Sequence, residues 1–202
     1  MPLRDGESFE LAPSVTSVKG LLCFASRPLG QWQEWVESGH EPVTPSGMVD
    51  RYEPPSEFLK ALVDDDAPLS SGEHAEVNLR QLIEMTRDEH PTNRDWATLL
   101  LAQQDIDTPN VREALVRAAE DENADVRAEA ILGLAQRDKA LALPLLRREL
   151  SGEVVPLPLF EAAAIVADPS LAADLRAFTE PSGDEFLDEL AIKALRACEA
   201  NA

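Results

Sequence analysis

The sequence predicts an all-α protein whose second half is a stack of antiparallel helix pairs. Two observations support this prediction. Only 5% of the residues are aromatic, while Ala and Leu, which favour helix over sheet, dominate the second half. From Asn93 onward, segments with apolar residues at helical spacing alternate with short breaks that carry Asp, Pro, Gly or Asn. We therefore expect packed helices and no substantial β-sheet after Pro91.

A repeat of about thirty residues organises these helices. Four alanines recur at intervals of 30 to 33 positions, at Ala102, Ala135, Ala167 and Ala197. The expected first helices are 93–103, 125–136, 157–167 and 184–197, and their partners are roughly 110–120, 139–150 and 169–178. This gives three full pairs and a terminal helix. Small residues would let neighbouring helices approach closely and share one core, namely Ala130, Gly133, Ala163 and Ala194.

One repeat carries a family resemblance. The segment Asp125-Val-Arg-Ala-Glu-Ala-Ile-Leu-Gly-Leu-Ala135 resembles the first helix of the bacterial HEAT repeat of the phycobilisome-lyase type, and Leu141-Ala-Leu-Pro-Leu-Leu146 resembles its second helix. The resemblance covers residues about 92–200 and weakens in the last helix, which lacks the Val-Arg pair. It implies an α-solenoid that scaffolds or recognises other proteins. Lyase chemistry belongs to a minority of the family, and no residue here supports carrying it over.

Residues 1–91 are less regular and are expected to form an N-terminal capping region in front of a repeat domain at 92–202. Short helices are predicted at 30–37 and at 56–63, the latter capped by Ser56, and a longer one at 73–88. Residues 1–20 are candidates for disorder. Because the end of a solenoid exposes apolar surface, the capping region is expected to cover it.

The formal charge of −20 limits the partners. Such a surface repels phosphate, so nucleic acid is not expected as a ligand. The acidity either confers solubility or favours a basic protein partner. Cys23 and Cys198 show neither disulfide nor zinc spacing, and no signal peptide or membrane span is recognisable. We expect a cytoplasmic protein without a cofactor or a bound metal, and its oligomeric state stays open.

Two groups of side chains are candidates for partner binding. Trp32 and Trp35 would share one face of a helical turn, either as an exposed interaction site or buried against the first repeat. The second helices, which the resemblance places on the concave face, carry a group of arginines that either converges on an acidic segment or phosphate, or pairs with local carboxylates. The group is Arg112, Arg117, Arg147, Arg148 and Arg176. Arg127 is expected to have a structural role, as an inter-repeat ion pair or cap.

No catalytic motif is recognisable: the sequence has no phosphate-binding Gly-rich loop, nucleophile elbow or His-Glu-x-x-His, and the three histidines are expected on helix surfaces. The leading hypothesis is a non-catalytic protein-interaction module, a scaffold or adaptor that uses its concave face. An acidic inhibitor or immunity-type protein that blocks a basic enzyme is the first alternative. A HEAT enzyme, either lyase-like or DNA-glycosylase-like, is the second.

Overall fold

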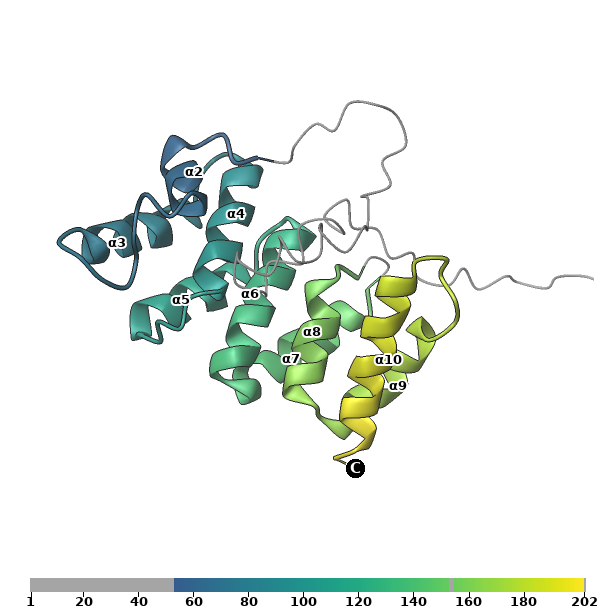
Figure 1. Ribbon diagram of the computed structural model, residues 1–202. Helices are drawn as coiled ribbons and strands as arrows, with labels where there is room; N and C mark the ends of the chain where they lie inside the picture. The colour runs from purple at the N-terminus through teal and green to yellow at the C-terminus, as the bar shows by residue number, and fades with distance from the viewer. Residues whose placement is uncertain (1–52, 153–154, 202) are drawn as a thin grey trace, which may run out of the picture.

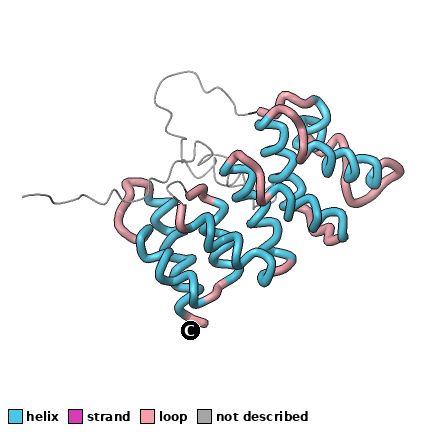
Figure 2. The backbone as a smooth tube through the Cα atoms, turned by 180° about the vertical axis from the view of Figure 1, so that it is seen from behind, coloured by secondary structure: helices cyan, strands magenta, loops and turns pink. Residues whose placement is uncertain are grey.

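The computed structural model describes residues 53–152 and 155–201, and every regular element in these ranges is helical (Figures 1 and 2). The prediction of an all-α fold is confirmed. The long helices are α3 (Ala75–Met85), α4 (Pro91–Ala102), α5 (Pro109–Ala118), α6 (Ala124–Arg137), α7 (Lys139–Leu150), α8 (Pro158–Val166) and α10 (Glu185–Glu199). Short ones are α2 (Glu57–Val63), η3 (Pro169–Leu171), α9 (Ala172–Leu175) and η4 (Arg176–Phe178).

The helix boundaries follow from local capping chemistry. The side chains of Thr108, Asn123 and Asp184 each accept a hydrogen bond from a backbone N–H in the first turn of α5, α6 and α10. Asp138 ends α6 and caps α7, where its Oδ1 accepts from the next turn. Proline stands in the first turn of α4, α5 and α8, where a missing N–H costs nothing. These signals are local, so the sequence located most helices to within a few residues.

The helices form two layers that differ in how tightly they pack. In the inner layer, α4, α6, α8 and α10 each pack directly against the next (Figure 1). In the outer layer, α5 makes little contact with α7. We call the layer of α4, α6, α8 and α10 the inner layer and the layer of α5 and α7 the outer layer. The expectation that the second helices line the concave face stays a prediction.

Small residues set the close spacing of the inner layer. A Cβ built on Gly133 of α6 would lie 2.9 Å from the Cβ of Ala102 in α4, closer than such atoms normally approach. Ala130, Ala163 and Ala194, which were predicted to allow close packing, are fully buried. The alanine repeat is only partly confirmed. Ala102 and Ala135 are buried, whereas Ala167 and Ala197 are half-buried.

The third pair is less regular than the first two. Ala167 ends α8 in the left-handed conformation, with φ 53°, and the predicted partner helix 169–178 is the broken run η3, α9 and η4. This run still packs into the stack, because the rings of Phe160 and Phe178 meet edge to face at 5.3 Å between centroids. The third helix pair is therefore present, but its second member is not one continuous α-helix.

The region before Pro91 is continuous with the stack where it is described. The predicted helices at 56–63 and 73–88 appear as α2 and α3, and Ser56 caps α2 as predicted. Helix α2 packs on α4, and α3 packs on α4 and α5. The backbone N–H of Ser56 donates to Oδ1 of Asn93 at 3.1 Å, which joins the start of α2 to α4. The predicted helix at 30–37 and residues 1–20 lie outside the described residues.

Helix α10 closes the other end of the stack. Its buried side holds Leu187, Ala191, Ala194 and Cys198, and its exposed side carries Glu185, Glu189, Lys193 and Arg196. Helix α10 therefore packs on the stack with its apolar side and carries charged residues on the other. Among the described residues, no helix is long and apolar enough to cross a membrane.

Candidate protein-interaction surfaces

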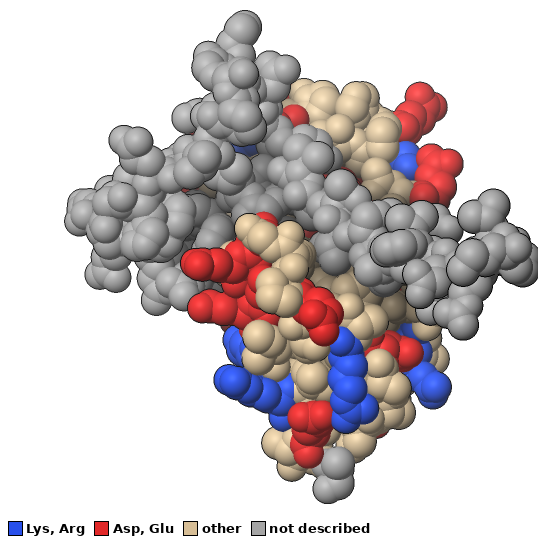
Figure 3. Space-filling view, turned by 90° about the vertical axis from the view of Figure 1, so that its right-hand side faces the viewer, with Lys and Arg blue, Asp and Glu red and all other residues tan. Residues whose placement is uncertain are grey.

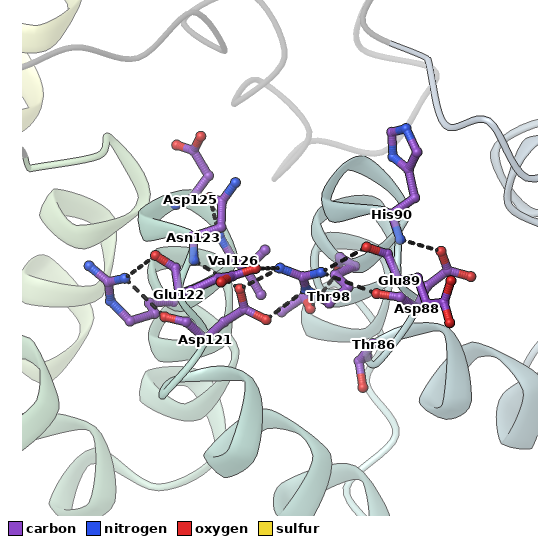
Figure 4. Close-up of polar contacts among 12 residues, drawn as sticks. Thr86, Asp88, Glu89, His90, Thr98, Asp121, Glu122, Asn123, Asp125 and Val126 are labelled. Atoms are coloured by element: carbon purple, nitrogen blue, oxygen red, sulfur yellow. Dashed lines mark hydrogen bonds and ion pairs between the residues drawn. The ribbon is translucent and has the colours of Figure 1, made fainter.

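Arg94, in the first turn of α4, connects two loops. Its Nε donates to Oδ2 of Asp121 at 2.8 Å and its Nη2 to Oε1 of Glu122 at 3.0 Å, both in the loop before α6. Its Nη1 donates to the carbonyls of Asp88 and Glu89 in the loop before α4. Figure 4 shows these four labelled residues facing one another from the two loops. The hydrogen bond that Arg94 donates to the Asp121 carboxylate is the main reason that the pKa of Arg94 is raised.

Arg127 occupies the equivalent position one repeat later. Its Nη1 donates to the carbonyls of Asp121 and Glu122 at 2.9 and 3.1 Å, as Arg94 does in the preceding loop. Its Nε and Nη2 donate to Oε2 of Glu149 in α7 at 3.0 and 2.9 Å. Arg127 thus ties α6 to α7 and to the linker that precedes α6. Its contacts are structural, as predicted, but the ion pair lies within one helix pair and not between repeats.

Arg137 has a third structural role, which the sequence analysis missed. Its guanidinium donates to backbone carbonyls at the end of α4, in the loop that follows, and in its own helix: those of Leu101, Ala102, Gln104, Ile106 and Gly133. A cation at a helix C-terminus satisfies carbonyls that have no partner within the helix. Burial lowers the pKa of Arg137, yet an arginine stays protonated. Residues of this kind hold the stack together and are poor candidates for partner binding.

Three of the five predicted binding arginines are engaged locally. Arg112 donates to both oxygens of Asp107 at 2.6 and 2.7 Å. Arg148 donates to both oxygens of Glu120 at 2.7 and 2.9 Å and to Glu149 of its own helix. The Nη2 of Arg176 donates to a carboxylate in the last turn of α10 at 2.7 Å. The alternative of local pairing therefore describes these three arginines.

Arg117 and Arg147 are held less firmly. Arg117 lies 3.9 Å from Glu113, beyond hydrogen-bond distance, and its buried Nη2 has no hydrogen-bond partner among the described residues. Burial, followed by the charge of Arg87, lowers the pKa of Arg117. Arg147 is exposed on α7, and its side chain has no hydrogen bond or ion pair to a residue that the structure describes. Within 53–152 and 155–201, these two members of the predicted group are the ones without a close hydrogen-bonded carboxylate.

The side of α6 that faces away from the outer layer has a different chemistry. Gly133 faces α4 and α5, and Arg127 reaches α7. At 100° per residue, the side opposite Arg127 carries Asp125, Glu129, Leu132 and Gln136. Glu129 is 1% exposed, Leu132 is 7% exposed and Gln136 is exposed. This side of α6 is therefore mixed, with two carboxylates beside an apolar residue and an amide.

The equivalent repeat positions of α4 and α8 extend this surface of α6 onto the neighbouring helices. The offset of 33 that relates Arg94 to Arg127 places Trp96, Leu99 and Gln103 on the corresponding side of α4, and an offset of 32 places Glu161 and Ala164 on α8. We name this set the inner face: Trp96, Leu99, Gln103, Asp125, Glu129, Leu132, Gln136, Glu161 and Ala164. Trp96 is 8% exposed, and the sequence analysis did not single out the carboxylates of this set. The repeat offset of 33 or 32 residues was the sequence signal that could have identified these carboxylates.

The α10 end of the stack separates its charges along the helix. In Figure 3, acidic side chains lie above and basic ones gather towards the C-terminal part of this end. The first turn of α10 carries Glu185 and Asp188, and its last turn carries Arg196. This order complements the helix dipole. The charge distribution here therefore has a structural explanation that requires no partner.

Other candidate sites contribute no chemistry in the described residues. No group of three or more His, Cys, Asp or Glu in 53–152 and 155–201 could hold a metal ion. His74 and His90 stand at the N-termini of α3 and α4, where Nδ1 of His90 accepts from the backbone of Thr92 at 3.2 Å. Trp32 and Trp35 lie outside the described residues, so their predicted role remains untested.

Comparison with known proteins identifies the repeats. Residues 79–156 match the family model for HEAT repeats, a range that starts earlier and ends sooner than the predicted 92–200. Protein YibA of Escherichia coli K12 is 32% identical over 90 residues, which is 45% of this chain and 32% of YibA, and YibA of E. coli O157:H7 gives the same values. The chain spans about a third of the length of these curated relatives. The X-ray structure of E. coli YibA aligns with a TM-score of 0.48 at 23% identity, over 69% of this chain and 54% of that one.

Proposed function

From the premise that residues 79–156 are HEAT repeats, we propose that this chain is a non-catalytic protein-binding module, a scaffold or adaptor. Stacked helical repeats form extended concave surfaces that bind other proteins. We also propose a reducing, cytoplasmic location, which the buried free thiol of Cys198 supports. Within this proposal, the partner binds the inner face.

The composition of the inner face supports this proposal. The neighbouring helices α4, α6 and α8 contribute apolar side chains, among them Trp96 and Leu99. The carboxylates of Asp125, Glu129 and Glu161 lie on α6 and α8 of the same face. Aromatic residues with apolar neighbours are typical of the energetically dominant part of an interface. The half-buried carboxylates of Asp125 and Glu161 would select a basic partner and increase the association rate. The expected partner is therefore a basic, amphipathic protein segment.

Charge substitutions on the two layers test this proposal. Gln103 and Gln136 are exposed at equivalent positions of the inner face, so Gln103→Lys with Gln136→Lys adds two positive charges without removing a core side chain. Asn110→Lys with Ala140→Lys adds the same charge at exposed positions of α5 and α7. A partner is first captured from the host with the wild-type chain, and its affinity for both purified variants is then measured.

We expect the inner-face variant to bind the partner at least about 10-fold more weakly, the loss that corresponds to about 1.4 kcal/mol, and the outer-layer variant to bind within twofold of wild type. Equal affinities of the two variants would contradict binding at the inner face. Circular dichroism and melting curves of both variants serve as folding controls.

The outer layer is a second candidate surface because Arg117 and Arg147 retain cationic capacity. An acidic partner would bind there, and Arg147→Glu would weaken it without disturbing the fold. Arg148 is unsuitable for the same test because it holds Glu120 and Glu149. Trp32 and Trp35 remain a third candidate from the sequence.

The inhibitor alternative is favoured by the same inner-face carboxylates, since a basic enzyme would be attracted to them. Association that weakens by an order of magnitude or more between 50 mM and 500 mM salt would support it. A DNA-glycosylase-like function would need a basic concave surface. The described inner face carries Asp125, Glu129 and Glu161 instead, so this face does not support that alternative.

A further inference from the structure

We propose that the outward side of helix α10 is a self-association surface, on which a second copy of this chain binds with its own α10 in the antiparallel direction. The inference goes beyond the proposed function and does not depend on the inner face, because it concerns a different surface at the end of the stack. Three observations carry it: the order of the charges on α10, their lack of partners among the described residues, and an apolar side chain between them.

Four charged side chains form one continuous stripe along α10. All four are exposed, and we name them the α10 stripe: Glu185, Glu189, Lys193 and Arg196. At about 100° per residue they lie within an arc of about 80°, on the side opposite the buried residues of the helix. The acidic half of the stripe comes first and the basic half follows, in keeping with the separation of charge in Figure 3.

The helix dipole accounts for only part of this order. Its interaction with charged side chains is confined to the first and last turns of a helix, which here contain Glu185 and Arg196. Glu189 and Lys193 lie in the middle of α10, beyond the reach of this effect. Each half of the stripe also holds two like charges one helical turn apart, which destabilises an isolated helix. The dipole therefore leaves the two central charges and the grouping of like charges unexplained.

The charges of the α10 stripe are available to a second molecule. None of the four side chains has a hydrogen bond or an ion pair to another residue within 53–152 and 155–201. Other charges of the same helix are engaged, because Asp188 accepts a hydrogen bond from Ser182 at 2.7 Å and Glu199 accepts one from Arg176 at 2.7 Å. The stripe therefore combines free charges of both signs on one surface.

An apolar side chain lies beside the middle of the stripe. Ile192 is half-buried and lies about 20° from Glu185 around the helix, on the outward side. The half-buried Leu190 and Leu195 pack against the hydrophobic core, whereas Ile192 belongs neither to that core nor to the side chains packed on it in the described part of the chain. An apolar centre with opposite charges before and after it is the pattern of a helix pair whose ion pairs fix its orientation.

A two-fold axis near Ala191 matches the stripe with that of a second copy. With a rise of about 1.5 Å per residue, Glu189 and Lys193 lie about 3 Å before and after this axis, so each glutamate meets the lysine of the other copy. Glu185 lies about 9 Å before the axis and Arg196 about 7.5 Å after it, a mismatch that long side chains absorb. The symmetry makes every ion pair occur twice. A parallel arrangement would place like charges opposite each other, so the charge order selects the antiparallel one.

The size of the surface predicts a weak and reversible contact. Helix α10 has 15 residues and is about 22 Å long, so its pairing buries less than the roughly 1,200 Å² of a standard stable interface. The ion pairs stay close to solvent and determine orientation more than affinity. We expect a dissociation constant on the order of 0.1 mM. Two copies joined in this way would bind a partner with repeated sites more tightly than one copy does.

Charge reversal of each half of the stripe tests the pairing. Sedimentation equilibrium of the full chain between about 10 µM and 1 mM measures the dissociation constant. One variant is Glu185→Lys with Glu189→Lys, and the other is Lys193→Glu with Arg196→Glu. Each variant alone has a stripe of one sign, so its self-association should weaken at least about 10-fold. An equal mixture of the two variants pairs a basic stripe with an acidic one, and its association should return at least to the wild-type level.

A matched control separates this effect from net charge. Glu73→Lys with Glu76→Lys makes the same charge change at exposed positions near the start of α3, and it should associate at least as tightly as wild type because net repulsion falls. Circular dichroism and melting curves check folding, and Glu189→Lys alone, which leaves the first turn of α10 unchanged, is used if the acidic-half variant unfolds. A wild-type chain that stays monomeric at about 1 mM would overturn the proposal. Unchanged association of the reversed variants would overturn it too, as would a mixture that associates no better than its components.

Discussion

Gly133 provides the sharpest test of the packing between α4 and α6. Replacing it with alanine has two opposing effects on the free energy of unfolding. Removing a glycine from the middle of a helix stabilises it by about 1 kcal/mol. The new Cβ would lie 2.9 Å from the Cβ and 3.1 Å from the Cα of Ala102, and 3.1 Å from Cδ1 of Leu115. Overpacking of this kind costs about 1–3 kcal/mol.

We therefore expect Gly133→Ala to destabilise the protein by up to about 2 kcal/mol, and Gly133→Leu by clearly more. For a chain of this length each kcal/mol corresponds to a drop of about 2–4 °C in the melting temperature. Ala102 contributes the Cβ and Cα atoms in the clash, so Ala102→Gly should restore part of the stability lost in Gly133→Ala. The double-mutant cycle isolates this coupling, which we expect to be at least about 0.5 kcal/mol.

Chemical unfolding followed by circular dichroism gives the four free energies of this cycle. The reasoning would be refuted if Gly133→Ala were about 1 kcal/mol more stable than wild type, since that is the effect of helix propensity alone. An unchanged melting curve for Gly133→Leu would also show that α6 does not approach α4 at this residue.

Three further predictions concern charge and reactivity. Arg127→Ala should lower the free energy of unfolding by about 2 kcal/mol, because the buried Glu149 loses its charged hydrogen bonds from Arg127 and keeps only its pairing with Arg148, whereas Arg147→Ala should change it by less than about 0.5 kcal/mol; urea unfolding measures both. The pKa of Asp107 lies below its ordinary value, chiefly because of the hydrogen bond from Arg112, so this pair stabilises the fold above the unfolded-state pKa and the contribution is lost as the pH falls through the folded-state pKa. Carboxyl NMR titration should show the pKa of Asp107 rising in Arg112→Gln, and no rise would contradict the pairing. Burial raises the pKa of the Cys198 thiol, so in Cys23→Ser a thiol reagent should react quickly only after denaturation.

The sequence predicted the helices well because their determinants are local. Asn123, Asp138 and Asp184 cap helices by accepting hydrogen bonds from backbone groups two or three residues away, and such signals can be recognised in a single chain. The arginines pair with carboxylates that are close in space but can be far away in the sequence. Arg148 pairs with Glu120, 28 residues earlier, and Arg176 with Glu199, 23 residues later. No pattern in the sequence distinguishes these arginines from Arg147, which is left without such a bond among the described residues.

The structural arginines could have been recognised from the repeat itself. Arg94 and Arg127 are 33 residues apart, and each binds the carbonyls five and six residues before it. Arg127 could be recognised because its Val-Arg pair matches the family pattern, whereas Arg94 follows Asn93 and does not match that pattern. The offset is thus a better guide to equivalent positions than the identity of a neighbour. The same offset of 33 residues identifies Trp96 in α4 as the position equivalent to Glu129 in α6.

The two layers differ in helix spacing, and the placement of small residues explains the difference. Gly133, Ala130, Ala163 and Ala194 all lie on α6, α8 and α10, whose axes can then come close together. In the outer layer the fully buried positions of α5 and α7 include Leu115 and Leu146, and the two helices make little contact with each other. Counts of small residues do not separate the layers in advance, because α4 and α5 carry two alanines each. The close approach of α4 and α6 depends on Gly133 facing Ala102, so it is the direction in which small residues point, and not their number, that sets the spacing of the inner layer.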